Sequence, residues 1–299
     1  MYIVFTKYFL LMQTFISETI DDILLKHSSF EDCVFVLPSQ RAGVFVKDTF
    51  KNKIVEGFLP EILTIESFIG QISEISKAGA FILTPEDVDW PQSLNDLAAP
   101  PIALLIKGQR ENLALLENAI SIVGTRNPTS YGLRIAGDFG VGVADHEWAV
   151  VSGGAIGIDA AAHKGCLVGE GITVAILGGG FNKNYPATHE RLFAEISESG
   201  LLISEVMPDV PAIPHRFLTR NRLIAALSKA TVVVEAAFRS GSLRTARDAA
   251  AIFRPVMAVP GPINSPTSEG CHRLIIERVA ELVSSVSEVM ELVKPISIK

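Results

Sequence analysis

Short apolar, β-branched runs alternate with helical patterns over most of the chain from Ala78 onward. Such runs are typical of strands that helices cover on both faces of a parallel sheet. Strands are predicted at 119–123, 149–151, 173–177, 201–204, 231–234 and 256–259. Helices are predicted at about 131–145, 159–169, 189–199, 220–226, 242–251, 270–279 and 284–293. The alternation predicts an α/β protein with an extended Rossmann-like, doubly wound parallel sheet.

The first quarter of the chain has a different pattern, which predicts a small α/β segment. Helices are expected at 15–27, 42–50 and 65–75, a strand at 33–37, and a turn at Pro38 and Ser39. This segment has too few strands to close a core alone. Ala42 is the only alanine before Ala78. We therefore expect an N-terminal fragment over 1–77, a linker and leading strand over 78–110, and the main domain over 111–299.

The linker prediction rests on the proline- and acid-rich stretch 84–101, which also suggests a short helical turn. A strand is expected directly after it, at 102–108.

The apolar opening 1–15 carries Lys7, lacks a small-residue cleavage site and is too short to span a bilayer. It predicts a buried strand or helix rather than a signal peptide or anchor.

Composition and charge narrow the class of protein. The chain has 299 residues, 48% of them hydrophobic and 20% charged, with a net charge of −7. That content suits a globular protein and leaves room for a local basic groove. The three cysteines are far apart, so we expect a cytoplasmic protein without disulfides, metal or cofactor.

Four predicted strands end in glycine or small polar residues, and these ends should meet at one edge of the sheet. They are AISIVGTR (119–126), AVVSGGAIGID (149–159), VAILGGG (174–180) and TVVVEAAFRSGSLRTA (231–246). Glycine admits an anion close to backbone N–H groups, and helix N-termini attract negative charge. The alternatives are that Arg126 forms an ion pair with a neighbouring carboxylate and that the glycines only permit tight turns.

Basic residues concentrate between 215 and 247 around a single acid, Glu235. They are His215, Arg216, Arg220, Arg222, Lys229, Arg239, Arg244 and Arg247. A local positive field of this kind suits a nucleic-acid backbone. For Lys229, Arg247 and Arg254, a solvated helix face is the more economical interpretation. For Arg220 and Arg222, phosphate contact and structural pairing both remain open.

Asp159 and His163 lie four residues apart and invite a catalytic interpretation. No serine or cysteine nucleophile accompanies them in sequence, so we expect no catalytic residues. Asp159 should start or cap a helix, and His163 should hydrogen-bond within the fold. Phe181 and Phe238 are candidates either for base stacking or for the core.

Eight ordered motifs together resemble the family of DNA-processing protein A (DprA/Smf), over about 81–299. They are GTR (124–126), SGGAIGIDAAAH (152–163), LGGGFNKNYP (177–186), SE (204–205), RFLTRNRLIAALS (216–228), VVEAAFRSGSLRTA (233–246), AVPGP (258–262) and SEGCHRLI (268–275). The resemblance implies a non-enzymatic protein that binds single-stranded DNA, dimerises and helps to load RecA recombinase during natural transformation. No membrane partner is expected.

The resemblance and the charge pattern together assign fourteen residues to DNA binding. They are Gly124, Thr125, Arg126, Ser152, Gly153, Gly154, Arg216, Arg220, Asn221, Arg222, Ser240, Gly241, Ser242 and Arg244. We expect the family's helical module before the main domain to be replaced here, and its winged-helix-like module afterwards is not expected. An alanine stands in IAALS (224–228) where IAGLS is commoner.

The stretches 34–50 and 58–69 resemble the start of AddB-like nuclease–helicase subunits, from which no catalytic function is carried over. A nuclease subunit is disfavoured because 1–76 offers no paired-carboxylate metal site. The remaining rival is a LOG-like phosphoribohydrolase or nucleotide sensor. Its motif PGGxGTxxE places a glutamate on the helix, whereas EAAFRSGSLRTA (235–246) has Arg244 and then Arg247 where acids would be expected.

Overall fold

The computed structural model describes residues 34–37, 46–47 and 61–293, and the chain divides into two compact units, Met1–Ser76 and Lys77–Lys299. In the first unit, β1 (Val34–Leu37) pairs in parallel with β2 (Glu61–Thr64), and α3 (Ile65–Lys77) follows β2 directly. The strand β2 was not predicted. The predicted helix at 15–27, the turn at 38–39 and most of the helix at 42–50 lie outside the described residues.

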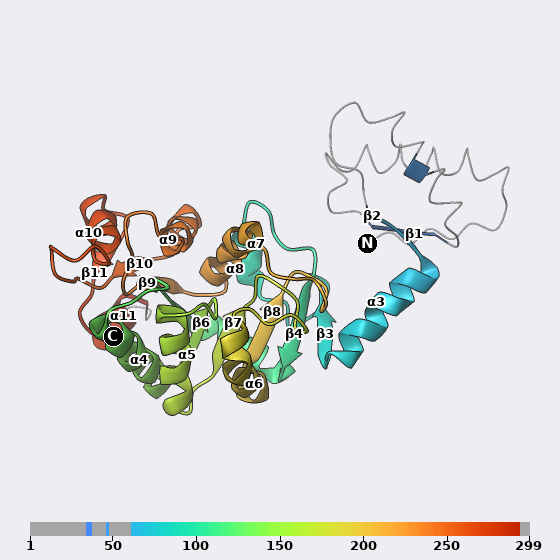
Figure 1. Ribbon diagram of the computed structural model, residues 1–299, viewed down its shortest axis with the longest axis horizontal. Helices are drawn as coiled ribbons and strands as arrows, with labels where there is room; N and C mark the ends of the chain where they lie inside the picture. Colours follow the sequence, from blue (N-terminus) through green and yellow to red (C-terminus); the bar gives the residue numbers. More distant parts are fainter. Residues whose placement is uncertain (1–33, 38–45, 48–60, 294–299) are drawn as a thin grey trace, which may run out of the picture. The chain divides into compact units, whose positions relative to one another are not determined.

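The second unit contains a twisted sheet whose nine described strands run in the order β11-β10-β9-β5-β6-β7-β8-β4-β3 (Figure 1). Their bounds are β3 Ala80–Leu83, β4 Leu104–Gly108, β5 Ala119–Val123, β6 Ala149–Ser152, β7 Thr173–Ile176, β8 Leu201–Ser204, β9 Ala230–Val233, β10 Val256–Ala258 and β11 Glu281–Leu282. Neighbours from β11 to β8 pair in parallel. The doubly wound α/β prediction is therefore confirmed.

One edge of the sheet departs from the parallel arrangement. Strand β4 pairs antiparallel with both β8 and β3. The connection from β3 to β4 contains a short 3-10 helix, Gln92–Asp96, but no crossover α-helix, so an antiparallel return is the accessible pairing. The strand β3 is four residues long and was missed.

Helices cover both faces of the sheet (Figure 1). Their bounds are α4 Ser130–Asp145, α5 Ile158–Val168, α6 Glu190–Ser199, α7 Pro214–Thr219, α8 Asn221–Ala226, α9 Ser242–Ala251, α10 Glu269–Ile276 and α11 Val286–Val293. Two further 3-10 helices occupy Arg110–Asn118 and Ala187–His189. The helix α7 was not predicted; it begins with Pro214, whose fixed φ suits the first helical turn.

Alternate residues of the strands enter two separate cores. In β5, Ile120 and Ile122 pack with α4, α5 and α11 on one face, while Ala119 and Val123 pack with α8, α9 and α10 on the other. This alternation follows from the two-residue period of a strand. Every residue of β5 is apolar except Ser121, whose hydroxyl donates to Thr231 Oγ1 at 2.7 Å within the sheet.

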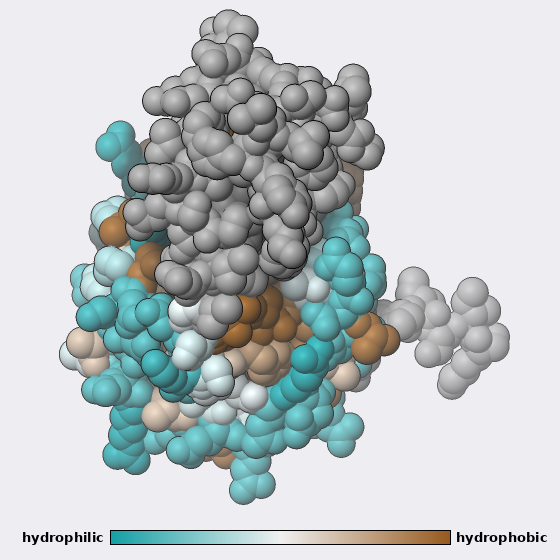
Figure 2. Space-filling model, turned by 90° about the vertical axis from the view of Figure 1, so that its right-hand side faces the viewer, coloured by the Kyte–Doolittle hydropathy of each residue, from teal (hydrophilic) through white to brown (hydrophobic). Residues whose placement is uncertain are grey.

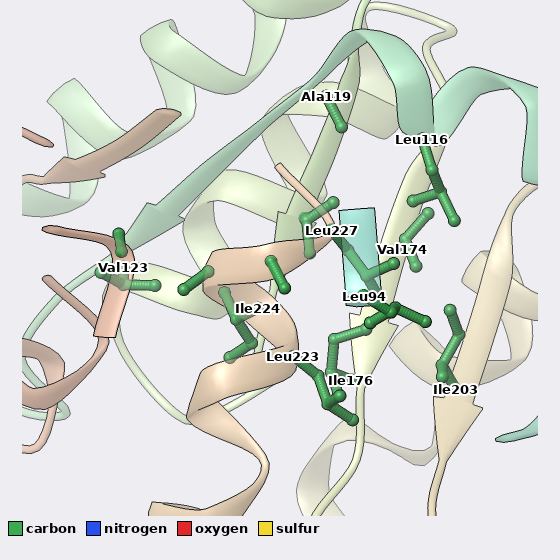
Figure 3. Packing of buried hydrophobic residues seen from close by; sticks show 14 of the residues in the cluster. Leu94, Leu116, Ala119, Val123, Val174, Ile176, Ile203, Leu223, Ile224 and Leu227 are labelled. Atoms are coloured by element: carbon green, nitrogen blue, oxygen red, sulfur yellow. The ribbon is translucent and has the colours of Figure 1, made fainter. Parts of the chain in front are cut away.

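The core under α8 also contains the stretch predicted to be a linker. Figure 3 shows Leu223, Ile224 and Leu227 packed against strand side chains, with Leu94 among them. Trp90 and Leu97 from the same stretch are buried as well. The predicted helical turn is present, but the segment packs into the core rather than joining two bodies loosely.

In Figure 2, hydrophilic residues make up most of the coloured surface, with apolar residues gathered at the centre just below the grey atoms and in smaller groups toward the left and right edges. Among the described residues, no helix has the length and apolar character needed to cross a membrane.

Candidate nucleic-acid interface

A pocket of about 720 Å³ opens where the carboxyl ends of β5 and β9 meet. The chain runs from β5 through β6 and β7 to β8 on one side of β5, and returns as β9 on the other. Ligands of open α/β sheets bind at such a switch point. The loops after β5 and β9 line the pocket together with α7 and α8.

Arg126 stands at the rim of this pocket. Its side chain is exposed, and its guanidinium lies 5.1 Å from the centre of the Phe217 ring. The centres of the Tyr185 and Phe217 rings lie 5.2 Å apart, and the two rings are tilted against each other. Arg126 forms no ion pair with any described carboxylate. The ion-pair alternative therefore finds no partner in the described part of the chain.

Arg220 lies in the floor of the same pocket and is only 5% exposed. Its Nη1 donates to the carbonyl oxygen of Gly153 at 2.6 Å and to that of Ile176. Burial lowers the pKa of Arg220 to about 10, against the opposing attraction of Asp159. The guanidinium therefore stays charged at neutral pH while it joins the ends of β6 and β7.

Asp159 completes this arrangement from α5. Its Oδ2 accepts the backbone N–H groups of Gly153 and Ala155, at 3.2 and 3.4 Å. Burial raises the pKa of the Asp159 carboxyl, and the nearby charge of Arg220 acts in the opposite direction. Helix α5 begins at Ile158, so the prediction that Asp159 starts a helix is correct.

Ser152, Gly153 and Gly154 lie beneath the pocket rather than in its lining. The Ser152 hydroxyl donates to the carbonyl of Ile122 at 2.6 Å, and the Gly153 N–H is taken by Asp159. A Cβ on Gly153 would collide with the Arg220 guanidinium. These contacts favour the tight-turn interpretation of this loop, because its polar groups already have internal partners.

Glu235 occupies the N-terminus of α4, where the sequence had suggested a phosphate. Its carboxylate accepts the N–H of Thr129 at 2.9 Å, the Thr129 hydroxyl at 2.7 Å and the Thr267 hydroxyl at 3.2 Å. A Cβ on Gly132 would collide with this carboxylate. The positive end of the helix is thus already matched by an internal anion. We call Asp159, Arg220 and Glu235 the frame of the pocket.

The loop between β9 and α9 forms the opposite rim. Ser240 Oγ and Ser242 Oγ lie 2.7 Å apart, and Asn221 Nδ2 donates to the carbonyl of Gly241 at 3.3 Å. Arg239 on this loop is exposed and forms no ion pair with a described residue. We call Arg126, Phe217 and Arg239 the rim of the pocket.

Gly124 and Thr125 line the pocket beside Arg126. The Thr125 N–H donates to the carbonyl of Glu235 at 2.6 Å, which joins the loop after β5 to the end of β9. A Cβ on Gly124 would collide with Ile158, so glycine is required there by packing. The structure therefore brings together Gly124, Thr125, Arg126, Arg220, Asn221, Ser240, Gly241 and Ser242 around one pocket.

Arg216 and Arg222 line a separate pocket of about 300 Å³, whose lining shares only Arg220 with the first. Arg222 forms an ion pair with Glu205 at 2.5 Å, and Arg216 donates to the carbonyl of Pro211 at 2.7 Å. This ion pair supports the structural-pairing interpretation of Arg222. Arg244 lies elsewhere again, in a basin that adjoins the first pocket, and pairs with Asp248 at 2.7 Å.

His163 and Phe181 belong to the interior. His163 is fully buried with its Nδ1 2.6 Å from Thr173 Oγ1, and burial lowers its pKa to about 3. The internal role predicted for His163 is correct. Phe181 is 5% exposed and is a core residue, whereas Phe238 is 42% exposed. Among the described residues, no group of histidine, cysteine, aspartate or glutamate side chains could hold a metal ion.

Sequence reasoning missed two aromatic contacts of this surface. Phe217 belongs to a quoted motif but was not singled out, although it lies beneath Arg126. Arg273 was also passed over, and its guanidinium lies 4.8 Å from the Phe238 ring. The spacing of arginine and phenylalanine in RFLTR (216–220) was the available signal for Phe217. No local signal pairs Arg273 with Phe238, because they come together through the tertiary fold.

Comparison with known proteins identifies the family of this chain. The family model described as DNA recombination-mediator protein A matches residues 81–294. A putative DNA processing protein DprA of Mycobacterium tuberculosis is 44% identical over 230 residues, which cover 73% of this chain and 59% of that relative. The match thus spans about three fifths of that relative's length.

Two solved structures are similar in fold. DNA processing protein A of Streptococcus pneumoniae has a TM-score of 0.72 at 29% identity, covering 95% of this chain and 93% of its own. The Helicobacter pylori protein of that name, described for its single-stranded DNA binding mode, has a TM-score of 0.63 at 29% identity. It covers 71% of this chain and 94% of its own.

Proposed function

Because the chain belongs to the DNA recombination-mediator protein A family, we propose that it binds single-stranded DNA and mediates recombination. The observation that carries this proposal is the exposed Arg126 beside the ring of Phe217 at the switch point of the sheet. A guanidinium contacts phosphate, and an aromatic ring stacks on an unpaired base. One pocket thus offers both groups that a single strand requires.

The charge of the pocket supports a polyanionic ligand. Arg126, Arg220 and Arg239 line it, with Asp159 as the acid among its lining residues. The buried Asp159 already accepts two backbone N–H groups. The rim arginines lie in a chain of net charge −7, so attraction for DNA must be local to this face.

The proposal extends to a non-enzymatic role. Glu235, the acid at the end of β9, is 3% exposed and is used to hold α4. Arg244 follows on α9 where a LOG-like enzyme would carry acid. The acidic groups that a glycosidic cleavage would need are thus engaged or replaced, which supports binding rather than hydrolysis.

We also propose the partners that the family resemblance implies. These are a second copy of the chain and RecA recombinase, in the cytoplasm of a cell that takes up DNA. Large apolar side chains exposed around α10, Ile263 at 95% and Ile276 at 80%, are consistent with a protein contact. Light scattering of the purified chain tests dimerisation, and a dimer mass is expected.

The test of DNA binding is fluorescence anisotropy of a labelled oligo-dT across a salt series, beside a duplex of matched length. We expect preference for the single strand, with affinity falling by ~0.7 log units per log unit of salt for each phosphate neutralised. Arg126→Ala should remove about one such contact. No binding at low salt, or equal affinity for the duplex, would contradict the proposal.

Arg191→Ala is the matched control for these measurements. Arg191 is 92% exposed on α6, pairs with Glu195 four residues later, and lines none of the pockets described above. It removes the same charge as Arg126→Ala, so an effect of net charge alone would appear in both variants. We expect binding by Arg191→Ala to match the unmodified chain.

A further inference from the structure

A second basic hollow adjoins the pocket on the far side of the loop between β9 and α9. It has a volume of about 420 Å³ and is lined by Phe238, Arg239, Arg244, Arg247 and Arg273, among others. Three segments supply these residues: the loop itself, α9 and α10. We call this hollow the basin.

The basin carries a net positive charge. Arg244 pairs with Asp248 at 2.7 Å, while Arg273 and Arg247 share Glu277 at 2.6 and 4.0 Å. Neither carboxylate belongs to the basin lining. Four guanidinium groups thus face two carboxylates. Exposed ion pairs of this kind contribute little to stability, so a phosphate can replace the carboxylate at small cost.

Phe238 gives the basin a stacking surface. Its side chain is 42% exposed and belongs to neither described hydrophobic core. The Arg273 guanidinium lies 4.8 Å from its ring centre. The arrangement matches that of Arg126 with Phe217 in the first pocket, at 5.1 Å. The two hollows therefore repeat one combination of groups, a cation beside an aromatic ring.

The basin and the pocket are continuous along the loop. Arg239, Ser240 and Gly241 line both, as does Leu218 of α7. A ligand that leaves the pocket across this loop meets the basin next. An extended, flexible polyanion with unpaired bases fits both hollows, whereas a mononucleotide would fill only one.

We propose that the basin is a second subsite for the same single strand. The strand crosses the loop 239–241, places phosphates near Arg244, Arg247 and Arg273, and stacks a base on Phe238. The inference rests on the proposed function, because it takes the ligand of the first pocket to be single-stranded DNA. Beyond that function, the inference states that longer strands bind more tightly because they also contact the residues of the basin.

The test is a length series of labelled dT oligonucleotides, measured by anisotropy on the full chain. The quantity to compare is the gain in affinity from the shortest strand that binds to the longest. Phe238→Ala should reduce that gain by roughly 5- to 150-fold, the usual effect of removing one stacking ring. Phe238→Tyr keeps the ring and should restore it.

The arginines provide an independent readout. A variant with Arg244, Arg247 and Arg273 all changed to alanine should reduce the salt dependence for the longest strand by about 2 log units per log unit of salt. The triple variant also loses three exposed ion pairs with Asp248 and Glu277. Arg191→Ala, which loses one exposed ion pair outside the basin, is the control for the effect of losing such a pair. Thermal melting of each variant confirms that it is folded.

Two outcomes overturn the inference, and they are distinguishable. If Arg126→Ala weakens binding while Phe238→Ala and the triple variant leave the length gain unchanged, the basin is not a subsite and the proposed function stands. If the unmodified chain binds no strand of any length at low salt, the proposed function fails and the inference fails with it.

Discussion

Arg126 at the rim of the pocket and Arg220 in its frame lie near the same ring, with guanidinium carbons 5.1 and 5.8 Å from the centre of Phe217. Arg126 is exposed, and no described carboxylate pairs with it. Arg220 is 5% exposed and donates to two backbone carbonyls. One pocket thus contains an arginine available to a ligand and another committed to the fold.

The difference shows how the rim of this pocket is supported on a parallel sheet. The carboxyl ends of the strands present carbonyl and N–H groups that need partners when buried. Here Arg220, Asp159 and Glu235 satisfy them from beneath. With the loops held in this way, Arg126 and Arg239 are exposed and pair with no described carboxylate. Separate substitutions should therefore affect stability and DNA affinity independently.

The largest expected effect is on stability, from Arg220→Ala. The change removes both carbonyl contacts and leaves Asp159 buried beside an empty space. We expect the free energy of unfolding to fall by about 3–5 kcal/mol, because two hydrogen bonds from a charged donor are lost and each is worth about 1.5–3 kcal/mol. Urea denaturation measures it, with Arg191→Ala as the neutral control. A loss below about 1 kcal/mol would show that Arg220 is not part of the frame.

The second effect concerns pH and the buried His163. Its folded pKa of about 3 lies well below its ordinary value near 6.5 because burial disfavours the charged ring. Protons therefore bind the unfolded chain more tightly, and stability is lost as pH falls below about 6.5. The loss from this group approaches about 1.4 kcal/mol per pH unit.

The difference between the unmodified chain and His163→Gln isolates that contribution. Asp159 acts in the opposite sense, because burial raises its pKa and the folded state holds its proton more tightly. Denaturation at pH 7 and pH 5 should show a smaller loss on acidification for His163→Gln. Equal losses in the two proteins would contradict the assignment of His163 to the interior.

The third effect is on affinity, from Arg126→Ala. A hydrogen bond to a charged group is worth about 1.5–3 kcal/mol, so affinity for oligo-dT should fall roughly 10- to 150-fold. Stability should stay within about 0.5 kcal/mol of the unmodified chain, because Arg126 is exposed. If Arg126→Ala lowers the free energy of unfolding as much as Arg220→Ala does, the distinction between rim and frame is wrong.

The smallest effect is expected from Asn221, which connects α8 to the loop at the rim. Its amide donates to the carbonyl of Gly241 and holds the loop that carries Arg239. Asn221→Ala should lower the free energy of unfolding by about 0.5–1.5 kcal/mol, the usual worth of one hydrogen bond. Affinity should fall less than in Arg126→Ala. Unchanged affinity would show that the loop is held by other contacts.

The alternation of apolar runs and helical patterns was enough to predict the doubly wound sheet and most of its helices. The runs 119–123 and 201–204 are strands with the predicted bounds. The edge was harder, because β3 is only four residues long and pairs with β4, whose own place in the sheet depends on its antiparallel pairing with the distant strand β8. The burial of Trp90 and Leu94 likewise depends on α8 and was hidden by the proline-rich composition around them.

Glycine and arginine in the sequence pointed to the loops after β5 and β9, which line the pocket, but not to how their residues divide between rim and frame. In the sequence, Arg126, Arg220 and Arg222 were equally good candidates for phosphate contact. In the fold they differ, because Arg220 donates to the carbonyls of Gly153 and Ile176 and Arg222 forms an ion pair with Glu205. Glu235 shows the same limit. In the sequence it is a single acid among basic residues, whereas in the fold its carboxylate accepts hydrogen bonds from Thr129 at the N-terminus of α4.

Hydrogen–deuterium exchange with and without oligo-dT tests the division between rim, frame and basin most directly. We predict that DNA slows amide exchange in 124–130, 214–219 and 237–247 and at the start of α10, and leaves α6 (Glu190–Ser199) unchanged. Protection confined to other surfaces, such as α6 or the segment 88–96, would contradict the placement of the DNA along this pocket and basin.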